Sequence, residues 1–194
     1  MPPASNSAAV IVVGAGPVGL TLANLLGESG IDVLVLEAET EQATDLRAST
    51  FHPPTLEMLE RLGVTQSLID QGMICPDWQL RWHPRGERAV FDMSVLADET
   101  RYPYRLQCEQ WKLSKLLLAQ ALARKNVQIK FDYRATAVTQ GDDGVVVEAE
   151  HAGNVEQFRA KYAVGCDGVR SMVRKSAGLA LGGKTYPEIG RAHV

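Results

Sequence analysis

The feature that most constrains the fold is the stretch from residue 8 to residue 37, which predicts a strand, a glycine turn, a helix and a second strand in succession. Residues 9–13 form an apolar run rich in β-branched side chains, typical of a strand buried on both faces of a parallel sheet. Residues 14–19 read GAGPVG and fit a GxGxxG pattern, and a second apolar run, 31–36, ends at Glu37. This order predicts a Rossmann-like α/β unit.

Each part of this unit has a physical role in holding a dinucleotide. Gly14 permits the tight turn, Gly16 lets the backbone approach a pyrophosphate, and Gly19 lets the helix pack closely on the strand. The free N–H groups and the positive end of the helix that follows Pro17 favour phosphates. Glu37 is placed to accept a hydrogen bond from a ribose hydroxyl at the adenosine end. We predict that these five residues bind the cofactor; a plain α/β turn without a ligand is the alternative.

The helix after the turn has a predicted buried face and a predicted end. Val18, Leu22, Leu25 and Leu26 recur at helical spacing, which predicts an apolar face. Gly30 follows where a helix C-terminus favours a left-handed residue.

The composition is that of an ordinary globular domain and points away from several classes of partner. The chain has 194 residues, of which 45% are hydrophobic and 22% charged, and its net charge is −3. This charge suggests neither a nucleic acid nor an anionic membrane as partner. The three cysteines are far apart and odd in number, which favours reduced thiols and a cytoplasmic location. No stretch reads as a signal peptide or a membrane span.

The rest of the chain continues the α/β pattern and adds antiparallel strands. We predict helices over 53–62, 64–71 and 110–124, a hairpin over 78–93 and a strand over 127–131. Three strands, 135–140, 145–150 and 155–160, predict an antiparallel meander inserted into the unit, and 162–166 predicts a strand that rejoins the parallel sheet. The tryptophans at 78, 82 and 111 are interpreted as packing residues, and the histidines at 52, 83 and 151 as surface or turn residues.

Four motifs, in this order along the chain, resemble the FAD-dependent aromatic hydroxylases, the single-component flavoprotein monooxygenases. The first is the glycine turn with Glu37, and the second is RAST at 47–50 followed by HPPTLE at 52–57. The third is Leu106-Gln107 before the helix 110–124, and the fourth is GCDGVRS at 165–171. The resemblance covers nearly the whole chain.

The resemblance implies roles for further residues. Arg47 would lie near the pyrophosphate and the flavin, where a guanidinium can donate paired hydrogen bonds. Gln107 would contact the ribityl chain. Asp167, with Gly168, would hold the loop beside the cofactor and serve both FAD and NAD(P)H, although its carboxylate could instead cap a helix starting near Val169. Arg170 is interpreted as structural.

The function implied by the resemblance is that of the FAD-binding portion of an NAD(P)H- and O2-dependent monooxygenase. It would hydroxylate a small phenol-like substrate through a flavin C4a-hydroperoxide, so no side chain needs to act as a catalytic nucleophile or metal ligand. A Gly-Asp motif that the family carries beyond its substrate domain is missing, so we interpret the chain as an N-terminal fragment. We expect a disordered leader at 1–7, an FAD-binding domain at 8–188 whose hairpin 78–93 leans toward the substrate domain, and a non-native tail at 189–194.

Three alternatives stay open at this stage. An NAD-linked Rossmann dehydrogenase agrees with Glu37, but Gln107, Asp167 and the meander argue against it. A truncated, non-catalytic product would expose apolar surface and aggregate. Within the flavin class, a reductase or a halogenase is a further alternative. The sequence does not indicate the substrate or the oligomeric state.

Overall fold

The largest sheet of the protein combines a parallel half with an antiparallel half. The computed structural model describes residues 6–45, 48–82 and 85–184. Six strands follow the order β8-β2-β1-β11-β10-β9, in which the first four are parallel and the last two antiparallel. Their bounds are β1 Ser7–Val13, β2 Val33–Leu36, β8 Val127–Lys130, β9 Arg134–Gly141, β10 Gly144–His151 and β11 Asn154–Gly165. The predicted α/β class with an antiparallel meander is confirmed. β1 begins at Ser7, inside the predicted leader, whose residues 1–5 lie outside the described ranges.

β11 differs from the prediction, because the strands expected at 155–160 and 162–166 are one strand of 12 residues. Its first part pairs antiparallel with β10, and its last part, from Arg159, pairs parallel with β1. No glycine or proline interrupts the chain between Asn154 and Val164, so nothing in the local sequence breaks the strand. The predicted meander is therefore inserted into the α/β unit, and its last strand runs without a break into the parallel sheet.

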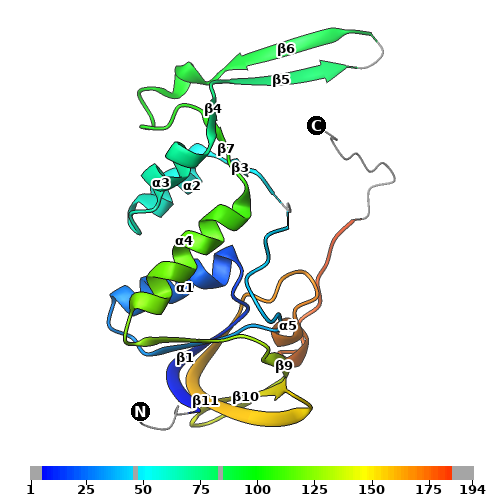
Figure 1. The fold of residues 1–194 in the computed structure, drawn as a ribbon. Helices are drawn as coiled ribbons and strands as arrows, with labels where there is room; N and C mark the ends of the chain where they lie inside the picture. Colours follow the sequence, from blue (N-terminus) through cyan, green and yellow to red (C-terminus); the bar gives the residue numbers. More distant parts are fainter. Residues whose placement is uncertain (1–5, 46–47, 83–84, 185–194) are drawn as a thin grey trace.

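Two helices, α1 (Pro17–Glu28) and α4 (Gln110–Ala123), cover one face of the parallel strands (Figure 1). Because side chains alternate along a strand, Val10 and Val12 of β1 pack toward these helices. Ile11 and Val13 face the other way, into a second cluster that includes Phe158 of β11. The core therefore lies on both faces of β1, and the glycine turn starts from the buried end of this strand.

The buried face of α1 differs from the predicted one and includes small residues that let α1 pack close to its neighbours. Val18 is 68% exposed, and the buried positions of α1 are instead Gly19, Leu20, Ala23, Asn24 and Gly27. The predicted Leu22, Leu25 and Leu26 are only partly buried against the core. The Asn24 amide donates hydrogen bonds of 2.9 Å to the Leu20 and Leu117 carbonyls and so joins α1 to α4. The expected left-handed residue after α1 is confirmed, since Gly30 has φ +76°.

Most of the remaining elements form a second region that ends in a protruding hairpin (Figure 1). They are β3 Thr50–Phe51, α2 Pro53–Glu60, α3 Thr65–Gln71, β4 Met73–Cys75, β5 Asp77–Trp82, β6 Glu87–Asp92, the short 3-10 helix η1 Met93–Leu96 and β7 Arg105–Gln107. The last helix, α5 Met172–Ser176, follows β11 and packs against β9 and β11 of the large sheet. β3, β7 and β4 form a small antiparallel sheet, and β5 pairs with β6 alone. The predicted helices and hairpin are confirmed.

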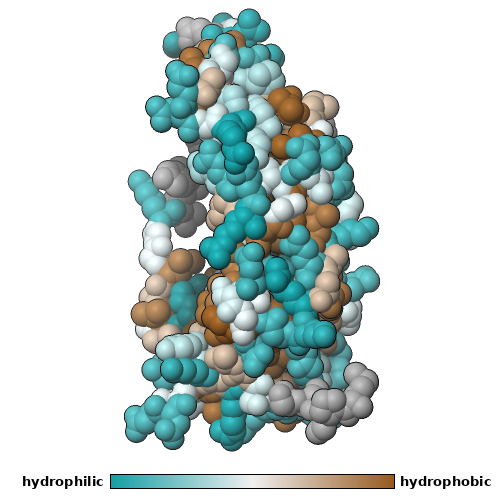
Figure 2. Space-filling view, turned by 90° about the vertical axis from the view of Figure 1, so that its left-hand side faces the viewer, coloured by the Kyte–Doolittle hydropathy of each residue, from teal (hydrophilic) through white to brown (hydrophobic). Residues whose placement is uncertain are grey.

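The tryptophans of the hairpin are not packed inside, contrary to the prediction. Trp78 and Trp82 are 42% and 59% exposed, and the Trp78 ring packs against its cross-strand neighbour Phe91, with ring centroids 5.0 Å apart. The face of the molecule in Figure 2 mixes hydrophilic and hydrophobic residues along its length. Within the described part of the chain, no helix is both long enough and apolar enough to cross a membrane.

Candidate functional site

A pocket of about 520 Å³ opens at the carboxyl ends of β1, β2 and β11. Five segments line it: the turn 13–18, the end of β2 with the loop to residue 45, the start of α4, the segment 131–135, and residues 166–172. Ligands of open α/β sheets bind at the carboxyl ends of parallel strands. The position of the pocket is therefore that of a dinucleotide site.

The three glycines of the turn have different surroundings. Gly14 has φ +104°, and a Cβ on it would lie 2.5 Å from the Cys166 carbonyl oxygen. A Cβ on Gly19 would lie 1.9 Å from the Gly14 oxygen. A Cβ on Gly16 would meet no described atom within 4 Å, and Gly16 lines the pocket. Gly14 and Gly19 thus serve the packing of strand against helix, and Gly16 leaves its backbone open toward the pocket.

The first turn of α1 lines the pocket and contains no acidic side chain of its own to meet its free N–H groups. The helix starts at Pro17, with Gly16 as the residue before it, and has no side-chain cap and no acidic residue in its first turn. The first N–H groups of a helix need partners from outside the helix. Together with the helix dipole, they favour an anion such as a pyrophosphate.

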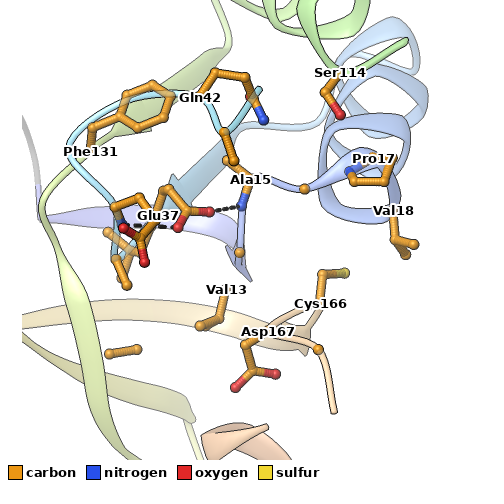
Figure 3. A pocket seen from close by; sticks show the side chains of 18 of the residues that line it. Val13, Ala15, Pro17, Val18, Glu37, Gln42, Ser114, Phe131, Cys166 and Asp167 are labelled. Atoms are coloured by element: carbon orange, nitrogen blue, oxygen red, sulfur yellow. Dashed lines mark hydrogen bonds between the residues drawn. The ribbon is translucent and has the colours of Figure 1, made fainter. Parts of the chain in front are cut away.

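Glu37 reaches the glycine turn from the end of β2 (Figure 3). Its Oε2 accepts a hydrogen bond of 2.6 Å from the Ala15 N–H, and its Oε1 accepts one of 3.0 Å from the Glu39 N–H. A carboxylate can accept about four hydrogen bonds. Glu37 therefore keeps acceptor capacity for a sugar hydroxyl while it fixes the turn.

One of the residues assigned by resemblance lies away from these groups. Gln107 donates a hydrogen bond of 2.7 Å from Nε2 to Ser49 Oγ and accepts one of 3.2 Å from Thr50 Oγ1. These bonds join β7 to the segment that leads into β3, and Gln107 is not part of the pocket lining. Arg47 lies outside the described residues.

Asp167 lines the pocket but directs its carboxylate at α5. Oδ2 accepts hydrogen bonds from the N–H groups of Met172 (2.6 Å) and Val173 (3.2 Å), while Oδ1 is buried without a hydrogen-bond partner among the described residues. In Figure 3 the Asp167 carboxylate points away from Glu37. The capped helix starts at Met172, later than the predicted start near Val169, and Ser171 is its N-cap residue. Gly168 and Arg170 also line the pocket.

Cys166 is the thiol of the pocket, and its surroundings keep it protonated. Burial raises the pKa of this thiol, and the nearby Asp167 charge raises it further. A neutral thiol is a weak nucleophile. Among the described residues, no group of three or more His, Cys, Asp or Glu side chains could hold a metal ion.

Several pocket residues escaped the sequence-based interpretation. Phe131, Tyr133, Gln42 and Ser114 line the pocket, and the Gln42 Oε1 atom is buried without a hydrogen-bond partner among the described residues. Figure 3 shows Phe131 and Gln42 on the side of Glu37 opposite Cys166 and Asp167. Phe131 could have been found, because it directly follows a strand of the parallel sheet, at the edge where ligands bind.

The fold and the site define a dinucleotide-binding α/β domain, and comparisons with known proteins identify its family. The family model described as "FAD binding domain" matches residues 7–191. The chain belongs to this family. Its cofactor class is FAD, so the prediction of FAD is confirmed over the NAD-linked alternative. The residues present fit such a cofactor, because Gly16 is open, the first turn of α1 lacks a cap and Gln42 presents an unpaired buried oxygen.

The individual relatives are monooxygenases and hydroxylases that are longer than this chain. Para-nitrophenol 4-monooxygenase of Pseudomonas sp. (strain WBC-3) is 39% identical over 180 residues, which are 92% of this chain and 44% of the relative. The crystal structure of p-nitrophenol 4-monooxygenase PnpA from Pseudomonas putida DLL-E4 matches with a TM-score of 0.87 at 36% identity, over 93% of this chain and 46% of that one. Aklavinone-11 hydroxylase, in a ternary complex with FAD and aklavinone, matches with a TM-score of 0.75 at 34% identity, over 88% of this chain and 35% of that one. The chain thus spans less than half the length of these relatives.

Proposed function

We propose that the chain supplies the adenosine and pyrophosphate half of the FAD site in an NAD(P)H- and O2-dependent monooxygenase that hydroxylates a small phenol-like aromatic compound. The observation that carries the proposal is the convergence of the open Gly16, the uncapped start of α1 and the Glu37 carboxylate on one pocket. The relatives' names, which include a nitrophenol monooxygenase, support the substrate class.

The residues of this chain bind and orient the flavin cofactor, and the bound flavin supplies the redox chemistry. Once bound, the flavin would supply the O2-activating hydroxylation chemistry that the family resemblance implies, with NAD(P)H as the reductant. The N–H groups at the start of α1 hold the pyrophosphate, and Glu37 accepts hydrogen bonds from the adenosine ribose. The raised pKa of Cys166 keeps that thiol neutral beside the cofactor.

The roles assigned by resemblance extend this proposal. Arg47 pairs with the pyrophosphate on the flavin side, and Gln107 contacts the ribityl chain after it exchanges its bonds to Ser49 and Thr50. Asp167 and Gly168 hold the loop beside the cofactor, and the two bonds from Asp167 to α5 support this positioning role.

The hairpin β5–β6 belongs to the substrate side of the longer protein. Its register places Trp78 opposite Phe91 and Leu80 opposite Ala89, so that with Trp82 these side chains share one apolar face. An isolated two-stranded hairpin is marginally stable, and an apolar face of this kind needs a covering surface. Residues 8–188 form the FAD-binding domain in this arrangement, and a cytoplasmic location suits the three free thiols.

The proposal is tested by titrating the chain with FAD and recording the change in flavin absorbance. The titration is made with the wild type and with two acid-to-alanine variants. Glu37→Ala removes the acceptor in the pocket. Glu28→Ala removes the same charge at the far end of α1, where the side chain only pairs with Arg61 at 3.5 Å. We expect Glu37→Ala to weaken FAD binding and Glu28→Ala to leave it unchanged. Equal FAD affinity for all three proteins would refute the assignment of Glu37.

A further inference from the structure

The wall of the pocket beside Glu37 contains a kink at Asp132, in the connection between β8 and β9. Asp132 has φ +61°, a left-handed conformation that is uncommon for a residue other than glycine, although Asp tolerates it better than most. The kink turns two successive N–H groups toward the segment after β2. Asp132 donates to the Glu39 carbonyl and Tyr133 to the Glu37 carbonyl, each at 2.8 Å.

These bonds fix the backbone of the acid that the proposed cofactor needs. The Glu37 N–H donates to the Lys130 carbonyl at 2.9 Å, and the Glu37 carbonyl accepts from Tyr133. Glu37 is thus held on both sides by the segment 130–133. Any change in the kink changes the position of Glu37 and of Tyr133, which lines the same pocket.

A histidine from a distant strand end holds this kink in place. His151 is the last residue of β10, and its Nδ1 lies 2.9 Å from the Asp132 carbonyl oxygen and 3.3 Å from Asp132 Oδ2. Both partners are acceptors, so Nδ1 carries a proton and donates. The imidazole also stacks on the Tyr133 ring, with centroids 4.3 Å apart and planes inclined by 6°.

We propose that His151 is a positioning residue for the cofactor site. By holding the left-handed turn at Asp132 and the ring of Tyr133, it keeps Glu37 in the geometry that receives the adenosine half of the dinucleotide. The inference rests on the proposed FAD site, and it assigns a cofactor-related role to a residue of the meander that touches no cofactor itself. A left-handed residue is unfavourable on its own, so an external contact raises the fraction of molecules in which the pocket wall is preformed. The apparent affinity for a ligand rises with that fraction.

Three variants separate the effect of the His151 hydrogen bond from the effect of its ring stacking and from a general loss of stability in the turn. His151→Phe keeps an aromatic ring for Tyr133 and removes the donor, whereas His151→Asn keeps a donor close to the position of Nδ1 and removes the ring. Asn154→Ala is the matched control, because Asn154 pairs with His151 across the same turn and its amide bonds only to the Ala152 carbonyl. His151 lies at the surface, so these changes leave the core intact.

Two measurements test the proposal. Calorimetric titration gives the Kd for FAD and for ADP, which represents the adenosine and pyrophosphate part alone. The exchange rates of the Asp132 and Tyr133 amide hydrogens, measured by NMR without ligand, show directly how stable the kink is. We expect His151→Phe to raise both Kd values by about three- to tenfold, as the loss of one hydrogen bond implies. We also expect faster exchange at both amides, a smaller effect for His151→Asn, and wild-type behaviour for Asn154→Ala.

The outcomes distinguish this inference from the proposed function. If the wild type binds FAD and ADP but His151→Phe binds them equally well, the positioning role is refuted and the FAD site stands. The same holds if exchange becomes faster while both Kd values stay unchanged. If the wild type binds neither ligand while exchange still responds to His151→Phe, the proposed function fails, and with it the role of the kink in binding.

Discussion

Replacing Gly16 with alanine separates binding from folding more sharply than any other change in the glycine turn. Gly16 has φ −71° and ψ −177°, values that alanine adopts without strain, and a Cβ there would meet no described atom within 4 Å. Loss of a glycine before a helix costs a few tenths of a kcal/mol to about 1 kcal/mol. The smaller entropy of the unfolded chain offsets this by about 0.4–1 kcal/mol. The folding stability of Gly16→Ala is therefore expected to stay within about 1 kcal/mol of the wild type.

The added methyl group nevertheless occupies the space in which a pyrophosphate would approach the backbone. A hydrogen bond from an N–H group to a charged partner contributes about 1.5–3 kcal/mol. Since each 1.4 kcal/mol is a factor of ten, the loss of one such bond predicts a Kd for FAD that is about 10- to 150-fold higher. Urea unfolding followed by circular dichroism and titration with FAD measure the two quantities on the same preparation.

Gly19→Ala is the matched control, because it adds the same methyl group to the same turn. Its Cβ would lie 1.9 Å from the Gly14 carbonyl oxygen, so α1 has to move away from the turn. Overpacking of this kind costs about 1–3 kcal/mol or more, and we expect a clear loss of stability. A wild-type Kd of Gly16→Ala for FAD would refute the role of Gly16 in binding, and wild-type stability of Gly19→Ala would refute the role of Gly19 in packing.

Three further predictions concern other parts of the chain. Asp167→Ala removes the acceptor for Met172 and Val173, so urea unfolding should show a loss of about 1–2 kcal/mol, most of which Asp167→Asn restores. Burial and the hydrogen bond to Glu60 raise the pKa of Tyr102 from 10.0 to about 12. The folded state therefore retains a proton that the unfolded chain loses, and stability falls as the pH rises from 10 toward 12; thermal unfolding of Tyr102→Phe should lack this component. Trp82→Gln, at an exposed position of the hairpin, should lower the fluorescence of bound anilinonaphthalene sulfonate with little change in melting temperature; unchanged fluorescence would contradict an exposed apolar face.

The sequence predicted the framework of the site because its signals are local. Residues 9–37 carry a buried strand, a glycine pattern and an acid in a fixed order, and the structure places all of them around one pocket. Helix α4 was found from its apolar face for the same reason. Local patterns of this kind survive in the fold because each element can form from its own sequence.

Features that depend on contacts between residues far apart in the sequence could not be predicted from local patterns. The buried face of α1 includes small residues such as Gly27, whose Cβ would lie 2.6 Å from Val127 Cγ2, and only the partner surface shows why they are needed. The fusion of two predicted strands into β11 depends on pairing with both β10 and β1. The kink at Asp132 depends on His151 and on the carbonyls of Glu37 and Glu39, which are far from it in sequence.

The proposed FAD site is tested most directly by a calorimetric titration of the purified chain with FAD and, in parallel, with NAD+. We expect FAD to bind one to one and NAD+ to bind weakly or not at all, because the glycine turn and Glu37 belong to an FAD-binding domain. Tight binding of NAD+ without binding of FAD would contradict this expectation.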